Sequence, residues 1–106
     1  MRQDVKQLAD AMEKGWQKIP HQNKRVFFGY EHNKIVSCCA MGHALVGARV
    51  SVSRMGKRFP ILNNQKVFTT STKIYMSLFE AIAVLNDNHD WTTLQVVDWL
   101  RTHVNG

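Results

Sequence analysis

Two adjacent cysteines and a nearby histidine are the residues of this 106-residue chain whose types could support nucleophilic chemistry. Cys38 and Cys39 open a run of small residues, and His43 lies one helical turn after Cys39. A thiol at the start of a helix has a lowered pKa, and a histidine within hydrogen-bond reach could serve as its base. Cys39 and His43 would both point along the same helix, however, so we favour buried structural thiols over reactive ones.

The same spacing of Cys39 and His43 could supply two zinc ligands from one helical face. Further ligands would have to come from His89 with Asp87 or Asp90, and that spacing is not specific for a metal. The sequence also lacks the signatures of phosphate-binding loops, dinucleotide-binding turns and helical zinc proteases. We therefore expect no metal site and no cofactor, and the sequence leans against an enzyme without deciding the question.

The strongest lead to function is a basic segment at residues 49–68. The whole chain has a net charge of +6, yet residues 49–73 contain six basic residues and no acidic one. In residues 74–106, by contrast, Arg101 is the one basic residue against four acidic ones. A cationic segment of this kind steers association with acidic partners. We predict the following partner-binding residues, with Phe59 as an apolar anchor: Arg49, Arg54, Lys57, Arg58, Phe59 and Lys66.

Three functions follow from this pattern. The one we favour is a small non-enzymatic interaction protein whose basic loop binds a protein with an acidic surface. The alternative is a nucleic-acid-binding protein that uses the same segment, because Phe59, Phe68 and Tyr75 could stack on bases while the cations neutralise phosphates. The third is a cysteine-dependent enzyme that uses Cys38 or Cys39. A basic loop that is merely solvated is also compatible with the sequence.

The first third of the chain predicts a helix followed by a small β element. Apolar residues recur with the helical period over residues 3–18, and Pro20 disfavours continuation of that helix. Aromatic and β-branched residues then flank a polar turn within residues 26–36, which is typical of a hairpin, and an irregular aromatic loop is the alternative. A two-stranded hairpin is marginally stable alone, so we expect this one to pack on the helices.

The centre of the fold is predicted to be a buried helix of small residues that begins with Ser37 as N-cap and ends near Val50. Its apolar residues lie on more than one side, which indicates a helix surrounded by protein. Gly42 and Gly47 each cost about 1 kcal/mol relative to alanine in a helix. Close contact with a neighbouring helix would offset that cost.

The rest of the chain predicts two more helices after an irregular connection. Residues 51–71 show no helical period, so we expect an exposed turn at residues 54–58 and short strands around residues 50–52 and 67–68. A helix is predicted over residues 73–85, a polar turn over residues 86–90, and a last helix after Thr92, which forms a capping box with Gln95. We thus predict one mainly α (α+β) compact globular domain, residues 1–106, of four helices with a small β-hairpin or short β element.

The same sequence predicts a cytoplasmic protein without a membrane partner. No apolar run approaches the ~20 residues that span a bilayer, and the N-terminus lacks the apolar core of a secretion signal. Adjacent cysteines in a helix diverge and do not meet the geometry of a disulfide, so we expect reduced thiols. The oligomeric state is left open.

Three short motifs carry a resemblance to a known group of proteins. Cys39-Ala40-Met41-Gly42, Leu85-Asn86-Asp87 and Asp98-Trp99-Leu100 make the chain similar to small uncharacterised proteins of phages and bacteria. Those proteins share a leading helix, a central helix that opens with Cys-Ala-x-Gly, and a late Asn-Asp turn; His43 stands where a small residue is expected. The resemblance implies a phage or mobile-element accessory factor that modulates a host macromolecule, located in the host cytoplasm if phage-encoded.

Overall fold

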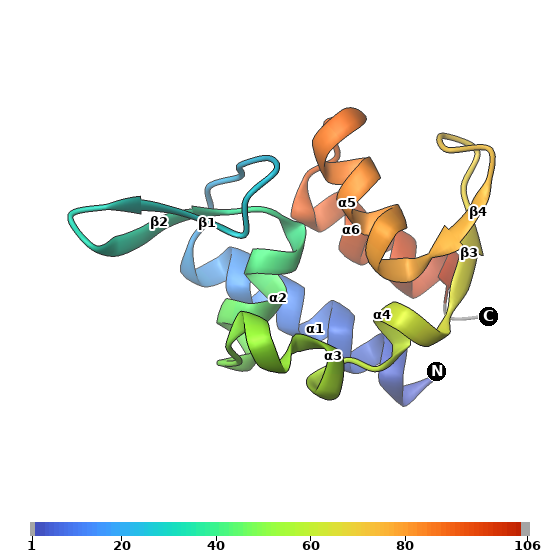
Figure 1. The fold of residues 1–106 in the computed structure, drawn as a ribbon, viewed down its shortest axis with the longest axis horizontal. Coiled ribbons are helices and arrows are strands. Elements are labelled where there is room, and N and C mark those ends of the chain that lie inside the picture. The colour runs from blue at the N-terminus through green and yellow to red at the C-terminus, as the bar shows by residue number, and fades with distance from the viewer. Residues whose placement is uncertain (1, 105–106) are drawn as a thin grey trace.

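The structure is a computed structural model that describes residues 2–104, and Figure 1 shows its fold. Within those residues, six α-helices and four strands follow one another along the chain: α1 (Gln3–Lys18), β1 (Phe28–Glu31), β2 (Lys34–Cys38), α2 (Ala40–Ala48), α3 (Met55–Arg58), α4 (Ile61–Asn64), β3 (Lys66–Phe68), β4 (Tyr75–Ser77), α5 (Leu78–Asn88) and α6 (Thr93–Trp99). A 3₁₀ turn at Val52–Arg54 precedes α3, and a π-helical turn at Leu100–Val104 follows α6. The fold is mainly helical with two small antiparallel sheets, so the α+β class is confirmed, whereas the predicted count of four helices is not.

Helices α1 and α2 pack against each other through small residues. The predicted helix over residues 3–18 is confirmed, and it buries an apolar stripe that includes Leu8 and Met12. Gly15 and Gly47 allow the two backbones to meet, because a Cβ atom on Gly47 would lie 1.7 Å from the carbonyl oxygen of Ala11. A Cβ atom on Gly15 would lie equally close to an α2 carbonyl oxygen. The predicted close helix contact at Gly47 is therefore present.

The central helix starts later than predicted. Ser37 and Cys38 pair with β1 in an antiparallel ladder, which keeps both residues extended, and Cys39 rather than Ser37 is the N-cap of α2. The Cys39 sulfur accepts a hydrogen bond from the Gly42 amide at 3.3 Å. The close neighbour of Gly42 is the carbonyl oxygen of Phe27 in the preceding connection, not a second helix as at Gly47.

The predicted hairpin within residues 26–36 is confirmed as β1 and β2, which extend away from the helices in Figure 1. His32 and Asn33 form its two-residue turn with positive φ angles of 51° and 62°. Two successive positive φ values are typical of the turns that match the twist of a hairpin. The paired strands lead directly into the N-terminus of α2.

Residues 51–64 are more helical than the sequence indicated. The expected exposed turn at residues 54–58 forms α3, and Pro60 is the N-cap of the next short helix, α4. Each element is a single turn, too short to show a helical period in the sequence. Phe59, Ile61 and Leu62 are buried and attach this segment to the core.

The predicted helix over residues 73–85 is displaced along the chain. Tyr75, Met76 and Ser77 pair with β3 as strand β4, and α5 then runs from Leu78 to Asn88. Ser77 caps this helix by accepting a hydrogen bond from the Glu80 amide at 3.2 Å. The second hairpin, β3–β4, therefore occupies residues that sequence periodicity assigned to a loop and a helical turn, although the short strand at residues 67–68 is confirmed.

The last helix begins as predicted. The Thr92 hydroxyl accepts a hydrogen bond from the Gln95 amide at 3.2 Å, and the Thr92 amide donates to the Gln95 side-chain oxygen at 2.8 Å. This reciprocal capping box fixes the start of α6. The core lies between α1, α2, α4, α5 and α6, and its largest fully buried side chains include Leu8, Met12, Leu45, Phe59, Leu62, Leu78, Ile82, Leu85 and Leu100.

Candidate functional site

The two thiols lie in environments that suppress their reactivity. Cys38 is fully buried at the end of β2, and burial, followed by the neighbouring Cys39, raises its pKa to about 11. Burial also raises the pKa of Cys39, although hydrogen bonds from the amides of Gly42 and Met41 act in the opposite direction. Because the thiolate is the nucleophilic form, neither residue is activated at neutral pH.

His43 is held as a neutral structural side chain. Its Nε2 lies 2.8 Å from the carbonyl oxygen of Ile19, and its Nδ1 lies 2.5 Å from the hydroxyl of Thr93. A carbonyl only accepts, so Nε2 carries the proton. The single hydroxyl proton of Thr93 has two acceptors, His43 Nδ1 at 2.5 Å and Gln22 Oε1 at 3.1 Å, and we assign it to the closer one, Nδ1. Burial lowers the pKa of His43. With both nitrogens engaged, His43 has none left to act as a base for Cys39 or as a zinc ligand.

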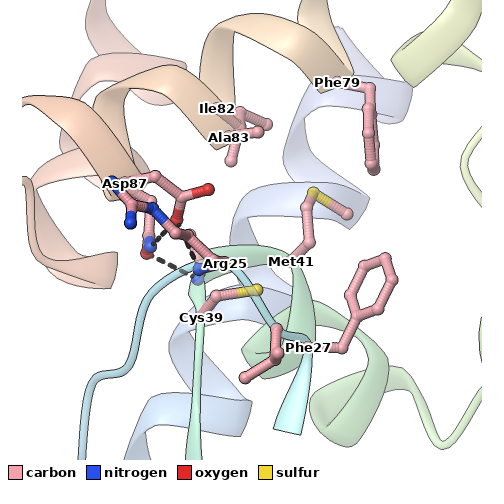
Figure 2. Close-up of a pocket in the computed structure, with 11 residues that line it drawn as sticks. Arg25, Phe27, Cys39, Met41, Phe79, Ile82, Ala83 and Asp87 are labelled. Atoms are coloured by element: carbon pink, nitrogen blue, oxygen red, sulfur yellow. Dashed lines mark hydrogen bonds between the residues drawn. The ribbon is translucent and has the colours of Figure 1, made fainter.

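Cys39 lines a cavity of about 220 Å³ between the connection before β1, the start of α2, and α5 (Figure 2). Phe27 and Phe79 belong to its mainly apolar wall, and Arg25 and Asp87 lie together at its polar side, where the Arg25 amide donates to Asp87 Oδ1 at 2.9 Å. Among residues 2–104, no histidine lines this cavity. The cavity thus combines a half-buried thiol with the carboxylate of Asp87, whose negative charge adds to burial in raising the pKa of Cys39.

Asn86 connects the segments around this cavity. Its Oδ1 accepts from the Ala40 amide at 2.9 Å and from the Gln22 side chain, and its Nδ2 donates to the Asn23 carbonyl oxygen at 3.0 Å and to Asp87 Oδ1 at 2.8 Å. Asn86 and Asp87 were predicted to form a turn, but both lie inside α5. A buried amide with this set of partners holds the connection after α1, the start of α2 and α5 together.

Four of the predicted partner-binding residues gather on one short segment. Arg49 ends α2 in the left-handed conformation, Arg54 ends the 3₁₀ turn, and Lys57 and Arg58 belong to α3. All four are exposed, and none forms a salt bridge with a carboxylate of the described chain, residues 2–104. We call Arg49, Arg54, Lys57 and Arg58 the basic surface.

Phe59 does not have the predicted role of an exposed anchor. Its side chain is only 1% exposed and belongs to the core. The Arg58 guanidinium lies 4.8 Å from the centre of the Phe59 ring and donates to Gln7 Oε1 on α1 at 3.4 Å. Phe59 therefore anchors the basic surface to the core and offers no apolar surface to a partner.

Lys66 lies apart from the basic surface, because α4 separates α3 from β3 (Figure 1). It lines a groove of about 420 Å³ together with Phe68 and Tyr75 of the second hairpin and with Gln65 and His103. Sequence reasoning missed Gln65 and His103. They come from distant parts of the chain, and no local pattern marks either of them.

Among residues 2–104, four cations outside the basic surface are paired with carboxylates, whereas the following six form no salt bridge: Lys14, Lys18, Arg25, Lys34, Lys66 and Lys73. Salt bridges join Arg2 to Asp4, Lys6 to Asp10, Lys24 to Asp90, and Arg101 to both Asp10 and Glu13. The hydrogen bond from Lys6, helped by Arg101, holds the pKa of Asp10 below its usual value. The Arg101 salt bridges join α1 to the C-terminal turn, and the Lys24–Asp90 salt bridge joins the connection after α1 to the segment before α6. The basic surface has no such pairing with the carboxylates of the described residues.

The part of the chain that the structure describes contains no cluster of three or more His, Cys, Asp and Glu side chains placed to hold a metal ion. None of its helices combines the length and apolar character needed to cross a membrane. Compared with known proteins, the chain matches no protein-family model, and no curated protein or solved structure is significantly similar to it.

Proposed function

We propose that this chain is a non-enzymatic interaction protein that binds an acidic surface of a partner protein through the basic surface. The observation that carries the proposal is the charge imbalance of this surface. Its four cations are exposed, lie within a stretch of sequence that contains no acidic residue, and form no salt bridge with the carboxylates of residues 2–104. Uncompensated cations attract an anionic partner and accelerate its association.

The support beneath the basic surface also favours this function. Phe59 and Leu62 fix the segment to the core, and Arg58 bonds to Gln7 on α1. A segment that is already ordered loses little conformational entropy when a partner binds. A cysteine-dependent enzyme has less support, because the pKa of Cys39 is raised and His43 is fully engaged by other groups.

A charge-reversal experiment tests the proposal. Arg54→Glu/Lys57→Glu changes the basic surface, and Lys18→Glu/Lys34→Glu makes the same change in net charge at exposed positions elsewhere. With a fluorescein-labelled polyglutamate peptide as probe, we expect the first variant to lose at least ~10-fold in affinity and the control at most ~3-fold. Equal losses would show that net charge alone governs binding and would refute a specific surface. Binding of a random DNA duplex in the same assay tests the nucleic-acid alternative at this surface.

The proposal includes a cytoplasmic accessory role, encoded by a phage or mobile element, in which the partner is a host protein. The motifs around Cys39, Asn86 and Trp99 support this part by resemblance alone. A pull-down from bacterial lysate, repeated with Arg54→Glu/Lys57→Glu, tests it. Recovery of one acidic protein by the unmodified chain and its loss with the variant are expected.

A further inference from the structure

The second hairpin presents two chemically different faces. Side chains alternate between faces along a strand, and Val67 and Met76, which pair across the hairpin, face the core. Lys66, Phe68 and Tyr75 project from the opposite face and are exposed. The hairpin thus holds a cation and two aromatic rings in solvent while its inner face anchors it.

Phe68 and Tyr75 form an exposed aromatic pair. They lie directly opposite each other in the strand register, with ring centres 5.4 Å apart and ring planes inclined by 44°. Phe68 remains 47% exposed and Tyr75 74% exposed. A cross-strand aromatic pair stabilises a hairpin, but each ring here still offers surface on which a planar ligand can stack.

A groove of about 420 Å³ begins at this pair. Phe68, Tyr75 and Lys66 line it from the hairpin, Gln65 lines it from the end of α4, and His103 from the C-terminal π-helical turn. The groove therefore brings together the exposed rings of Phe68 and Tyr75, an ammonium group, an amide and an imidazole, and the largely buried Trp99 also lines it.

Aromatic rings can hold a base by its face. The Gln65 side chain is held by Arg2 and by the Lys66 carbonyl oxygen. His103 Nδ1 lies 2.7 Å from the Thr102 hydroxyl. The two aromatic rings therefore carry the recognition of the base.

The charge around the groove favours a polyanion. Besides Lys66, Arg2 lines the groove, where it pairs with Asp4 and bonds to Gln65 at 3.0 Å. Lys73 lies exposed in the turn of the same hairpin. Among residues 2–104, no acidic residue lines the groove.

We propose that the groove beside the β3–β4 hairpin binds single-stranded nucleic acid. Bases stack on Phe68 and Tyr75, and the phosphates that flank them lie near Lys66 and Lys73. The ligand is single-stranded because only unpaired bases expose both faces for stacking on side chains. This site is separate from the basic surface and does not depend on the function proposed for it.

Binding to labelled oligonucleotides tests the proposal. The probe is a fluorescein-labelled single strand of about fifteen nucleotides of mixed sequence, as DNA and as RNA, followed by anisotropy against the matching duplex. We expect Tyr75→Ala and Phe68→Ala each to weaken binding of the single strand by roughly 5- to 150-fold. The matched control is Tyr30→Ala, which removes an aromatic side chain of 64% exposure from the other hairpin and should change the affinity less than ~2-fold.

Two further variants separate stacking from folding. Tyr75→Phe keeps the ring and should keep the affinity, whereas Tyr75→Leu keeps apolar bulk in the hairpin but should lose affinity because it cannot stack. Lys66→Gln should lower the slope of log affinity against log salt by about 0.7, the value for one phosphate contact on a single strand. Circular dichroism of each variant reports whether the fold is retained.

Four results would overturn the proposal: no saturable binding of the single strand at low salt, equal or tighter binding of the duplex, equal losses for Tyr30→Ala and Tyr75→Ala, or binding of polyglutamate that depends on Tyr75. The last result would assign the groove to an acidic protein partner. The Arg54→Glu/Lys57→Glu variant should bind the single strand with its dependence on Tyr75 intact. A negative result for the groove would therefore leave the function proposed for the basic surface untouched, and the two proposals can fail separately.

Discussion

Gly47 of α2 lies in backbone contact with Ala11 of α1. A Cβ atom at Gly47 would stand 1.7 Å from the carbonyl oxygen and 2.7 Å from the carbonyl carbon of Ala11, and both of those atoms are backbone. A flexible side chain could move out of the way, but a helix backbone can do so only if the whole helix shifts. The distance between α1 and α2 is therefore set by the absence of a side chain at this position.

Gly47→Ala should lower the free energy of unfolding by about 3 kcal/mol, because the added methyl group forces the two helices apart. Gly56→Ala is the matched control, since a Cβ atom there would meet only the Asn63 side chain at 3.5 Å. That control should change stability by less than about 1 kcal/mol and can even stabilise α3. Urea unfolding measures both. Equal midpoints for the two variants would contradict the backbone contact.

Asn86→Ala should destabilise the protein by about 3 kcal/mol, because it leaves the Ala40 amide and the Asn23 carbonyl without partners inside the fold. Asn88→Ala, at the exposed end of the same helix, removes the same atoms and should cost less than about 0.5 kcal/mol. Thermal or urea unfolding distinguishes the two. A small effect of Asn86→Ala would mean that water replaces the lost hydrogen bonds.

His43 should make stability depend on pH. Burial lowers its pKa in the folded state below the ordinary value of 6.5, so the unfolded chain binds more protons in this range. Its contribution is complete above pH 6.5 and is lost as the pH falls toward the folded-state pKa, with a slope of at most about 1.4 kcal/mol per pH unit. Urea unfolding between pH 8 and pH 5 measures this slope.

The matching variants assign that slope to His43. His43→Gln keeps a donor for Ile19 and an acceptor for Thr93 but does not titrate, so it should flatten the dependence. His89→Gln changes an exposed histidine and should leave it unchanged. A slope that survives in His43→Gln would place its origin in another group.

Both thiols should resist alkylation in the folded protein. A pKa of about 11 in place of 9.0 leaves Cys38 with about one hundredth of the usual thiolate at neutral pH. Iodoacetamide at pH 7.5, followed by mass spectrometry, should modify Cys38 at least ~100-fold more slowly than in the urea-unfolded chain, and Cys39 should also be slowed. Modification of Cys39 as fast in the folded as in the unfolded chain would favour the cysteine-enzyme hypothesis.

Local signals predicted those elements of the fold that depend mainly on neighbouring residues. The amphipathic stripe of α1 and the reciprocal cap of Thr92 and Gln95 both act within a few residues, and both are confirmed. The predicted start of α5 was wrong, because Tyr75 pairs with Phe68 in a hairpin, and the periodicity of the sequence does not reveal such a contact. A usable signal was present there, since Ser77 and Glu80 have the spacing of a capping pair.

The candidate sites were predictable only in part, because charge is visible in a sequence and burial is not. Arg54 and Lys57 are exposed without carboxylate partners among residues 2–104, as their acid-free neighbourhood suggested. Phe59 and Phe68 are aromatic residues of the same basic segment, yet the first is in the core and the second is half exposed. The difference arises from the short helical turns after residue 51, which direct Phe59 inward. His103 lies at the groove only because of tertiary packing, which no local sequence pattern reveals.

The hydrogen bonds of Asn86 have a consequence for motion. The side-chain amide of Asn86, on α5, forms hydrogen bonds with the connection after α1 and with the start of α2. Gln22, one of its partners, also accepts a hydrogen bond from the Thr93 amide at the start of α6. No single one of these segments can open without breaking bonds that the others use. Their amide protons should therefore exchange with deuterated solvent in one concerted event, so that this side of the molecule opens as a single cooperative unit.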